Sequence, residues 1–341
     1  SLPFVENFDS HTGSTSGTTN NLPSCWNNIS GSYSSYAGYP IIYNSSSSAA
    51  SGSNSMRFYV GTTTSYDYGD EYAILPPIDQ TLYPINTLQL TMDVRKGSTS
   101  YTDFTLIVGV MSNPSDANTF VPVDTIVRPD ATYDEYTVYF SNYTGTGNFI
   151  ALCAPKNTQN NVAYNTGYVD NIVVDVIPSC PRPNDLTVTG ITSNTIDLSW
   201  TDYSSGAASS WTVEYGTPGF TPGTYAGTIL QANTNSITLP NLTANTSYEI
   251  YVMADCGMGD QSTWSNPLVV TTSCDLLTTL PFTENFDSYT AYTSTSASTS
   301  NLPNCWNNLS GSYSSYAGYP IIYYSSSTNY ASSAPNAMRF Y

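Results

Sequence analysis

The chain has 341 residues, of which 9% are charged, and its 25 acidic against 7 basic residues give a net charge of −18. This acidity excludes nucleic acid and anionic membranes as expected partners, because phosphate binding needs clustered Lys and Arg. No apolar run approaches the roughly 20 residues of a membrane span, so we expect no membrane insertion in this segment. The 30 tyrosines favour strands over helices.

The chain begins with a segment that it later repeats. Residues 2–10 return 278 residues later as residues 280–288, and residues 21–47 return as 301–327 with 24 of 27 positions identical. The tetrapeptide that ends at Tyr59 returns at the end of the sequence. We therefore expect a first domain over 1–178 and the N-terminal part of a second copy over 274–341, as in a window on a longer tandem array.

The segment between the two copies alternates apolar and polar side chains with a period of two. This alternation runs through residues 88–94, 104–110 and 136–140, and turn signals rich in Gly, Pro and Asn separate the runs. Short strands at this spacing, without a 3.6-residue period, predict a β-sandwich. The prolines within residues 177–183 predict a domain boundary, because proline cannot continue a central ladder.

Residues 181–273 resemble a fibronectin type III domain. Ile196, Leu198 and Trp200 form an alternating, inward-facing strand, and residues 242–252 are similar to the L-x-P-x-T-x-Y corner of that family. The dipeptide at 244–245 departs from the usual proline of the corner. The resemblance implies a second sandwich, for which we expect the bounds 180–273.

The first domain resembles the MAM-like and cleaved-adhesin jelly rolls of bacterial surface proteins, including the adhesin regions of gingipain-type proteins. Three segments carry the resemblance, namely residues 4–9, 22–26 and 168–174. The resemblance implies an adhesive or carbohydrate-binding module of a large exported chain. The expected fold class is thus all-β, a jelly-roll sandwich followed by a fibronectin type III sandwich and the start of a second jelly roll.

Six cysteines without a CxxC pair indicate disulfides and an oxidising compartment, so we expect the protein outside the cell or at its surface. Cys180 opens the fibronectin-like domain and Cys256 ends its penultimate strand. Both are expected at the same end of that sandwich, which favours a Cys180–Cys256 bond.

The remaining cysteines allow more than one arrangement. The MAM-like resemblance implies a Cys274–Cys305 bond, and the counterpart of Cys274 in the first copy would lie ahead of residue 1. Cys25 would then have no partner within these residues, and Cys153 would be a buried free thiol. The alternative is a Cys25–Cys153 bond, and the sequence leaves this choice open.

Carboxylates in the first domain suggest a metal site. Glu6 shares strand parity with two phenylalanines, and Asp170 shares it with two aliphatic residues, so both carboxylates are expected to point inward. Buried like charges repel, and Ca²⁺ supplies the counter-charge to such oxygen ligands. The predicted cofactor is therefore Ca²⁺, with Asp9 and Asp70 as further ligands from the rim. The alternative is that a carboxylate caps a turn or accepts hydrogen bonds from backbone N–H groups.

No catalytic residues are predicted. The single histidine, His11, lies in a loop of small polar residues, and no nucleophile elbow, phosphate loop or HExxH motif occurs. The chain is therefore predicted not to be an enzyme.

Tyrosines crowd two segments of the first domain. Exposed rings offer apolar faces with a hydroxyl group, suited to stacking on sugars or proteins, whereas rings in strands would be core residues. The candidate stacking residues are Tyr33, Tyr36, Tyr39, Tyr66 and Tyr68.

One short motif suggests a modification. Residues 124–126 match an Asp-Ser/Thr-aliphatic pattern that carries O-linked glycans in some secreted bacterial proteins, which makes Thr125 a candidate O-glycosylation site.

These features favour a structural and adhesive protein of the cell exterior, built of tandem sandwiches that form a fibre or stalk. The expected partners are other copies of itself, and glycans or host or cell-surface proteins. The alternative is a carbohydrate-binding accessory region of a larger exported hydrolase, which binding to a glycan array would favour.

Overall fold

The computed structural model describes residues 1–17, 20–30, 38–60, 69–98, 103–156, 165–291, 301–303, 305–306, 320–324 and 336–340. Within these ranges the regular structure is β-strand, apart from two single-turn 3₁₀ helices, η1 (Ile85–Thr87) and η2 (Ala117–Thr119). The predicted all-β fold class is therefore confirmed.

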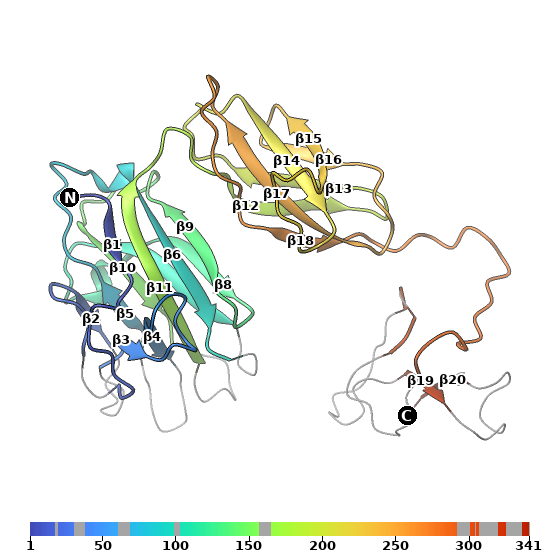
Figure 1. Cartoon of the computed structure of the whole chain (residues 1–341), viewed down its shortest axis with the longest axis horizontal. Coiled ribbons are helices and arrows are strands. Elements are labelled where there is room, and N and C mark those ends of the chain that lie inside the picture. Colours follow the sequence, from blue (N-terminus) through green and yellow to red (C-terminus); the bar gives the residue numbers. More distant parts are fainter. Residues whose placement is uncertain are drawn as a thin grey trace. The chain divides into compact units, whose positions relative to one another are not determined.

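The first sandwich consists of two antiparallel sheets that face each other (Figure 1). One sheet has the order β3-β4-β11-β6-β9, with β1 also paired to β11, and the other has the order β2-β5-β10-β7-β8. Its strands are β1 (Phe4–Glu6), β2 (Asn27–Ile29), β3 (Ile41–Asn44), β4 (Asn54–Val60), β5 (Glu71–Ile74), β6 (Leu88–Lys96), β7 (Phe104–Met111), β8 (Val121–Arg128), β9 (Asp134–Tyr139), β10 (Phe149–Ala154) and β11 (Asn165–Val176).

The core lies between the two sheets and follows the period of two that the sequence predicts. Strand β6 alternates buried and partly exposed residues along its whole length. Because neighbouring side chains on a strand point to opposite faces, one residue in two can enter the core. Eight residues of β6 and β7 fill its centre with no exposed surface: Leu88, Leu90, Met92, Val94, Phe104, Leu106, Val108 and Val110.

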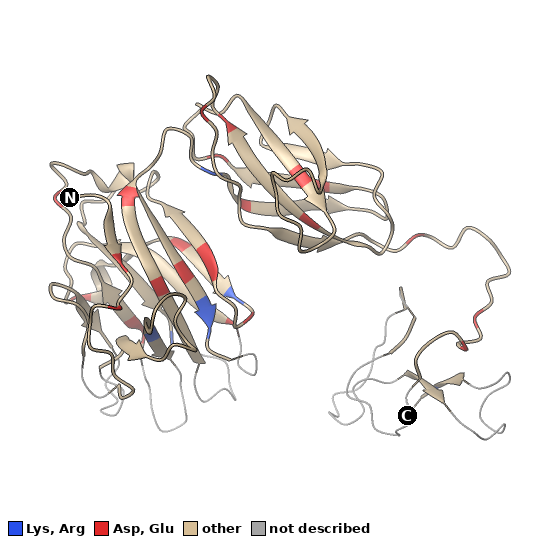
Figure 2. Ribbon diagram, viewed as in Figure 1, with Lys and Arg blue, Asp and Glu red and all other residues tan. Residues whose placement is uncertain are grey.

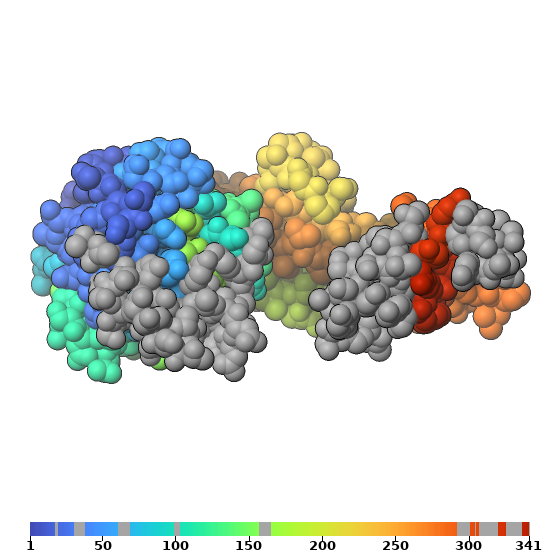
Figure 3. Space-filling model, turned by 90° about the horizontal axis from the view of Figure 1, so that it is seen from below, coloured from blue at the N-terminus to red at the C-terminus, as the bar shows by residue number. Residues whose placement is uncertain are grey.

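Strand β11 is shared by two partners along one of its edges. Its first half pairs with β4 from Asn165 to Val169, and its second half pairs with β1 from Ile172 to Val174. The change of partner falls at Asp170 and Asn171, where the ladder to β6 is also shifted and Asn171 has a φ of 49°. In Figure 3 the yellow-green surface of this strand adjoins blue residues far away in sequence.

The second sandwich has a three-stranded sheet, β12-β13-β16, and a four-stranded sheet, β15-β14-β17-β18. Trp200 and Trp211 pack edge to face in its core, with ring centroids 5.9 Å apart. Trp200 is buried, as the alternation over residues 196–200 predicts. The strands are β12 (Asn184–Ile191), β13 (Ile196–Thr201), β14 (Ser210–Gly216), β15 (Thr228–Ala232), β16 (Ser236–Leu239), β17 (Ser247–Asp255) and β18 (Leu268–Thr271).

The repeated segment forms the same hairpin in both copies. Strands β19 (Ile321–Tyr324) and β20 (Asn336–Arg339) pair in the register of β3 and β4. The side chain of Asn301 accepts from the amide of Ile322 and donates to its carbonyl, and Asn21 does the same for Ile42. Sequence identity in the repeat thus extends to its hydrogen bonds.

A second asparagine anchors the head of each copy to its hairpin. The Nδ2 of Asn54 donates to the carbonyls of Phe8 and His11, at 3.1 and 2.9 Å. The Nδ2 of Asn336 donates to the matching carbonyls of Phe286 and Tyr289, at 3.1 and 3.0 Å.

The head of the second copy differs in one respect. Its Phe282 is 46% exposed, and residues 282–284 form no strand. Strand β1 is held by β11, and residues 274–341 include no segment that repeats residues 165–176. The local hydrogen bonds are therefore the same in both copies, whereas the strand depends on a partner distant in sequence.

We expect Asn54→Ala to destabilise the first sandwich by about 2 kcal/mol, because two carbonyls lose their donor in a mostly buried place. Urea denaturation monitored by tryptophan fluorescence measures this change. The matched control is Asn118→Ala, whose side chain donates only to the exposed carboxylate of Asp116. Equal stability of the two variants would contradict the anchoring role.

Candidate functional site

Two carboxylates of the first sandwich bind the backbone of one loop, residues 48–53. Asp170 has no exposed surface, and its Oδ2 accepts from the amides of Ala50 and Ser51 at 2.9 and 3.1 Å. On the other side, Oδ1 of Asp9 accepts from the amide of Ser53 at 2.8 Å. Backbone N–H groups thus satisfy both carboxylates, which is the alternative that the sequence left open.

The loop can pass close to the carboxylate of Asp9 because residue 52 is a glycine. Gly52 has a φ of 57°, and a Cβ built on it would lie 1.9 Å from Oδ2 of Asp9. A side chain here would be strained and would displace the carboxylate. Beside the loop, the hydroxyl of Ser51 donates to Oδ1 of Asn171, whose Nδ2 donates to Oδ2 of Asp93 at 2.7 Å.

The predicted metal ligands do not gather into one set. Glu6 accepts from the amide of Phe8 at 2.7 Å, and Asp70 accepts from the amide of Lys156 at 2.8 Å. In the described ranges no three His, Cys, Asp or Glu side chains are placed to hold a metal ion. Glu6 and Asp70 therefore do not form one ligand set with Asp9 and Asp170, the two carboxylates that bind the loop.

Calcium binding stays a prediction for the two loop-binding carboxylates, Asp9 and Asp170. Calorimetry with and without EDTA tests it, because loss of bound Ca²⁺ lowers the melting temperature of the sandwich that holds it. An unchanged melting temperature contradicts the prediction.

Burial raises the pKa of Asp170 to about 6, and the charge of Asp9 adds to the increase, although three backbone donors oppose it. The unfolded pKa is about 3.9. Between these values the folded state binds more protons, so this group makes stability fall as the pH rises from about 4 to 6.

Asp170→Asn removes this titration. We expect the free energy of unfolding of the wild type, minus that of the variant, to decrease between about pH 4 and 6, by on the order of 2 kcal/mol. Urea denaturation of both proteins at a series of pH values measures it. A difference that does not change with pH would contradict the assignment.

Arginine and tyrosine side chains alternate across the outer face of the β3-β4-β11-β6 sheet, and we call this set the arginine–tyrosine row. The guanidinium carbon of Arg57 lies 4.7 Å from the ring centre of Tyr43 and 5.9 Å from that of Tyr168. Arg95 lies 4.8 Å from Tyr168 and 5.3 Å from Tyr133. Partly desolvated contacts of this kind contribute about 1 kcal/mol each.

The row includes one of the predicted stacking residues. Tyr39 is only 2% exposed, and its ring packs on Tyr59 at 5.5 Å and near Arg57 at 5.8 Å. Its prediction as an exposed stacking residue is therefore wrong, because a strand neighbour and a guanidinium group cover its faces. The other four candidates, Tyr33, Tyr36, Tyr66 and Tyr68, lie outside the described residues.

Sequence reasoning missed the contacts of Arg57, and it expected Glu71, together with Asp70, as a calcium ligand at the rim rather than as a buried carboxyl. Glu71 is 1% exposed and accepts from the amide of Tyr59 at 2.8 Å. Burial raises its pKa well above the ordinary value, while nearby Arg57 lowers it. The repeat could have indicated the contact of Arg57 with Tyr43, because both residues recur in the second copy. There Arg339 lies 4.7 Å from the ring centre of Tyr323, the same distance as between Arg57 and Tyr43.

The single histidine, His11, contacts a glutamate, and in the second copy a tyrosine makes the matching contact. Nε2 of His11 lies 3.1 Å from Oε2 of Glu6. In the second copy the hydroxyl of Tyr289 donates to Oε2 of Glu284 at the same distance of 3.1 Å. Tyrosine thus replaces histidine in this pair, and a contact to the glutamate at the head of the domain is kept in both copies.

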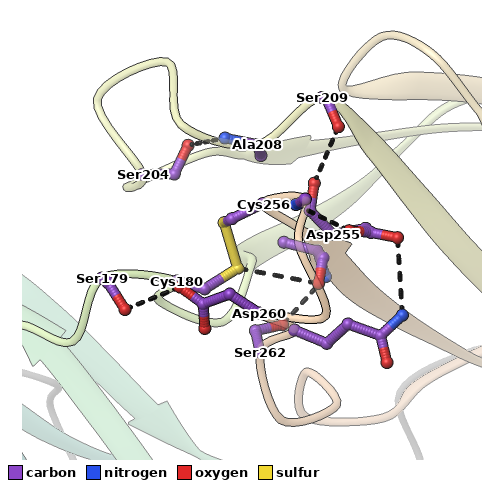
Figure 4. The surroundings of a disulfide bond; sticks show 12 residues. Ser179, Cys180, Ser204, Ala208, Ser209, Asp255, Cys256, Asp260 and Ser262 are labelled. Carbon is purple, nitrogen blue, oxygen red and sulfur yellow. Dashed lines mark hydrogen bonds between the residues drawn. A yellow bond between two sulfur atoms is a disulfide. The ribbon is translucent and has the colours of Figure 1, made fainter.

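Both disulfides expected from the sequence are present. Cys180 and Cys256 are joined across 76 residues of sequence, in the surroundings that Figure 4 shows. The amide of Cys256 donates to the carbonyl of Asp260, whose carboxylate accepts from the hydroxyl of Ser179 at 2.7 Å. The bond thus closes the end of β17 onto the segment that leads into β12.

The other bond joins Cys274 and Cys305, while Cys25 is an exposed free thiol and Cys153 a buried one. Burial raises the pKa of Cys153 to about 12, so this thiol is protonated and unreactive at neutral pH. The Cys25–Cys153 alternative is not formed.

The segment that leaves the first sandwich is hydrogen bonded to strand β9. Arg182 donates to the carboxylate of Glu135 at 3.0 Å and to the hydroxyl of Thr137 at 2.6 Å. Asn184 donates to the carbonyl of Thr137 at 2.7 Å, and the hydroxyl of Tyr139 donates to the carbonyl of Arg182. The connecting segment therefore has fixed partners on the sheet edge.

Thr125 is exposed on β8, an edge strand of the second sheet of the first sandwich. A glycosyltransferase could reach it there, and its O-glycosylation stays a prediction.

Residues 181–271 match the family model of the fibronectin type III domain. Comparison with the sequences of curated proteins finds no match. No helix in the described ranges is long and apolar enough to cross a membrane.

Several solved structures are similar to parts of the chain. The human fibronectin type III domain containing protein 3 has a domain with 22% identity that covers 28% of this chain and 88% of its own, with a TM-score of 0.24. The K2 cleaved adhesin domain of Lys-gingipain has 15% identity and covers 51% of this chain and 98% of its own, with a TM-score of 0.36. The glycoside hydrolase domain of Endo-D from Streptococcus pneumoniae R6 has 13% identity and covers 73% and 37%, with a TM-score of 0.29.

The fold and the family match define a class, an all-β protein of successive sandwich domains. Within that class, residues 181–271 are a fibronectin type III domain, and the sandwich ahead of it has a distant structural likeness to a cleaved adhesin domain. The disulfides and the fibronectin type III domain indicate an extracellular protein.

Proposed function

We propose that this chain is part of an extracellular structural and adhesive protein, in which the two kinds of sandwich alternate along a tandem array that forms a fibre or stalk. The carrying observation is the repeat, in which the hydrogen bonds of the head and of the first hairpin recur in both copies. A unit whose local hydrogen bonds form in each copy can be repeated many times without redesign.

The connections between domains support the same proposal. The Cys180–Cys256 bond closes the entrance of the fibronectin type III domain, and the Cys274–Cys305 bond closes the entrance of the next repeat. Covalent closure at each entrance limits unravelling under load, because a disulfide restricts the unfolded chain. Such closures suit a protein that transmits tension outside the cell.

The carbohydrate-binding alternative ranks second because of the arginine–tyrosine row. Sugar stacking needs open ring faces, and Tyr39, Tyr59 and Tyr168 are at most 9% exposed. In the described ranges these tyrosines therefore stabilise a sheet. A glycan array that gave reproducible binding, lost on replacing Tyr33 or Tyr66, would reverse this ranking.

Electron microscopy of native surface material tests the proposal. We expect filaments on which gold-labelled antibodies to the fibronectin type III domain recur at one regular axial spacing, because each repeat contains one such domain. Antibodies to the hairpin of the first sandwich serve as a matched probe and should show the same period. Single particles, or gold confined to one point of each filament, would contradict the tandem fibre.

A further inference from the structure

A pocket of about 270 Å³ lies beside the start of β1 in the first sandwich. Its walls come from the chain head, from the segment that follows β5, and from Val174 of β11. The larger apolar side chains of the lining are Leu2, Phe4, Leu75, Ile78, Leu82 and Tyr83, and Ser1 and Asp79 are its polar residues.

Backbone hydrogen bonds hold these walls in place. The amide of Leu75 donates to the carbonyl of Ile150, and the amide of Ile78 donates to that of Asn148 at 2.8 Å. The turn beyond them is closed by the amide of Leu82, which donates to the carbonyl of Asp79 at 3.1 Å. Leu82 nevertheless stays 69% exposed at the rim. The pocket is therefore formed before anything enters it.

The size and lining of the pocket favour aliphatic side chains as its occupant. A cavity of roughly 150 Å³ with apolar walls holds one benzene molecule, so a pocket of about 270 Å³ has room for one or two branched side chains. Small-molecule sites are commonly larger, at about 300–1,000 Å³, and carry convergent polar groups.

The chain itself contains a segment with such side chains. Leu276 and Leu277 are 86% and 69% exposed, which is unusual for adjacent leucines in a polar chain. They directly precede the Leu-Pro-Phe motif at 280–282. The same motif, at residues 2–4, provides two side chains of the pocket wall.

We propose that the pocket binds the leucines of a segment with the sequence of residues 275–278 when that segment stands directly ahead of the Leu-Pro-Phe motif. Leu277 is three residues ahead of Leu280, and three extended residues span about 10 Å. A segment joined to the chain head therefore reaches the adjacent pocket without a loop. The inference rests on the proposed tandem array, in which a fibronectin type III domain and its exit segment precede a sandwich.

The far end of the segment has a matching attachment point. Cys305, which bonds Cys274 at the start of the segment, has a φ of 69°, and its counterpart Cys25 has a φ of 70°. Cys25 is exposed, so a cysteine at the position of Cys274 could reach it. A segment held at Cys25 and at Leu2 would be fixed at both ends beside the pocket.

An N-terminal extension of the full chain tests the proposal. One protein carries Ser-Asp-Leu-Leu-Thr ahead of Ser1, and its control carries Ser-Asp-Ser-Ser-Thr, so that neither contains the cysteine. We expect the leucine extension to raise the melting temperature of the first sandwich over the control by on the order of 5 °C. Amides 78–83 should also exchange hydrogen more slowly.

A second pair of proteins places the effect in the pocket. Leu82→Ser alters only the exposed rim, and in this background the gain from the leucine extension should fall by about half. Equal melting temperatures and equal exchange for the two extensions would overturn the proposal, as would a gain that Leu82→Ser leaves unchanged. These measurements are made on a single chain. A negative result would contradict the pocket proposal but not the tandem fibre, which electron microscopy tests separately. Absence of filaments would likewise not change the result for the pocket.

Discussion

The first sandwich depends on one shared edge of strand β11, where β4 and β1 meet end to end. A strand that changes partner leaves backbone groups unpaired at the junction, and these must find other partners. Here the ladder shifts at Asp170, whose buried carboxylate accepts from the backbone N–H of Asn171 at the junction. It also accepts from the backbone N–H groups of Ala50 and Ser51. The loop that provides these amides is held from its other side by Asp9. Two carboxylates, Asp170 and Asp9, thus join the last strand and the chain head to the loop of the first hairpin.

Local patterns predicted the features that depend on neighbours in sequence. The period of two over Leu88–Val94 gave the core face of β6, and parity placed Asp170 inside, where the structure has it. The expected metal set failed for the opposite reason. Asp70 lies where β5 meets β10, next to Lys156, and no local pattern reveals which strands become neighbours in a sandwich. Parity gives the direction of a side chain, and only the sheet order gives its surroundings.

The repeat separates what a segment determines alone from what its context adds. Asn54 and Asn336 make the same pair of bonds, and Glu6 and Glu284 accept from matching amides. These contacts fall within about 50 residues, so each copy can form them by itself. Trp306 is 39% exposed, whereas Trp26 of the first copy is 8% exposed. Trp26 packs on Phe4 and Phe8, whereas Trp306 packs on Phe286. Burial of this ring therefore includes a contact from β1, the strand that β11 holds.

The distribution of charge limits the kinds of contact that this protein can make with another acidic surface. All five arginines contact tyrosine rings or carboxylates within the fold, as Arg57 does with Tyr43 and Arg182 with Glu135, and Lys96 is only 3% exposed. Acidic residues are spread over the strands and loops of the described ranges and outnumber the basic ones (Figure 2). Two such surfaces repel each other at long range, so in the proposed array cohesion between copies would have to come from short-range contacts. Apolar insertion into a formed pocket and disulfide closure are contacts of that kind, since neither needs opposite charge.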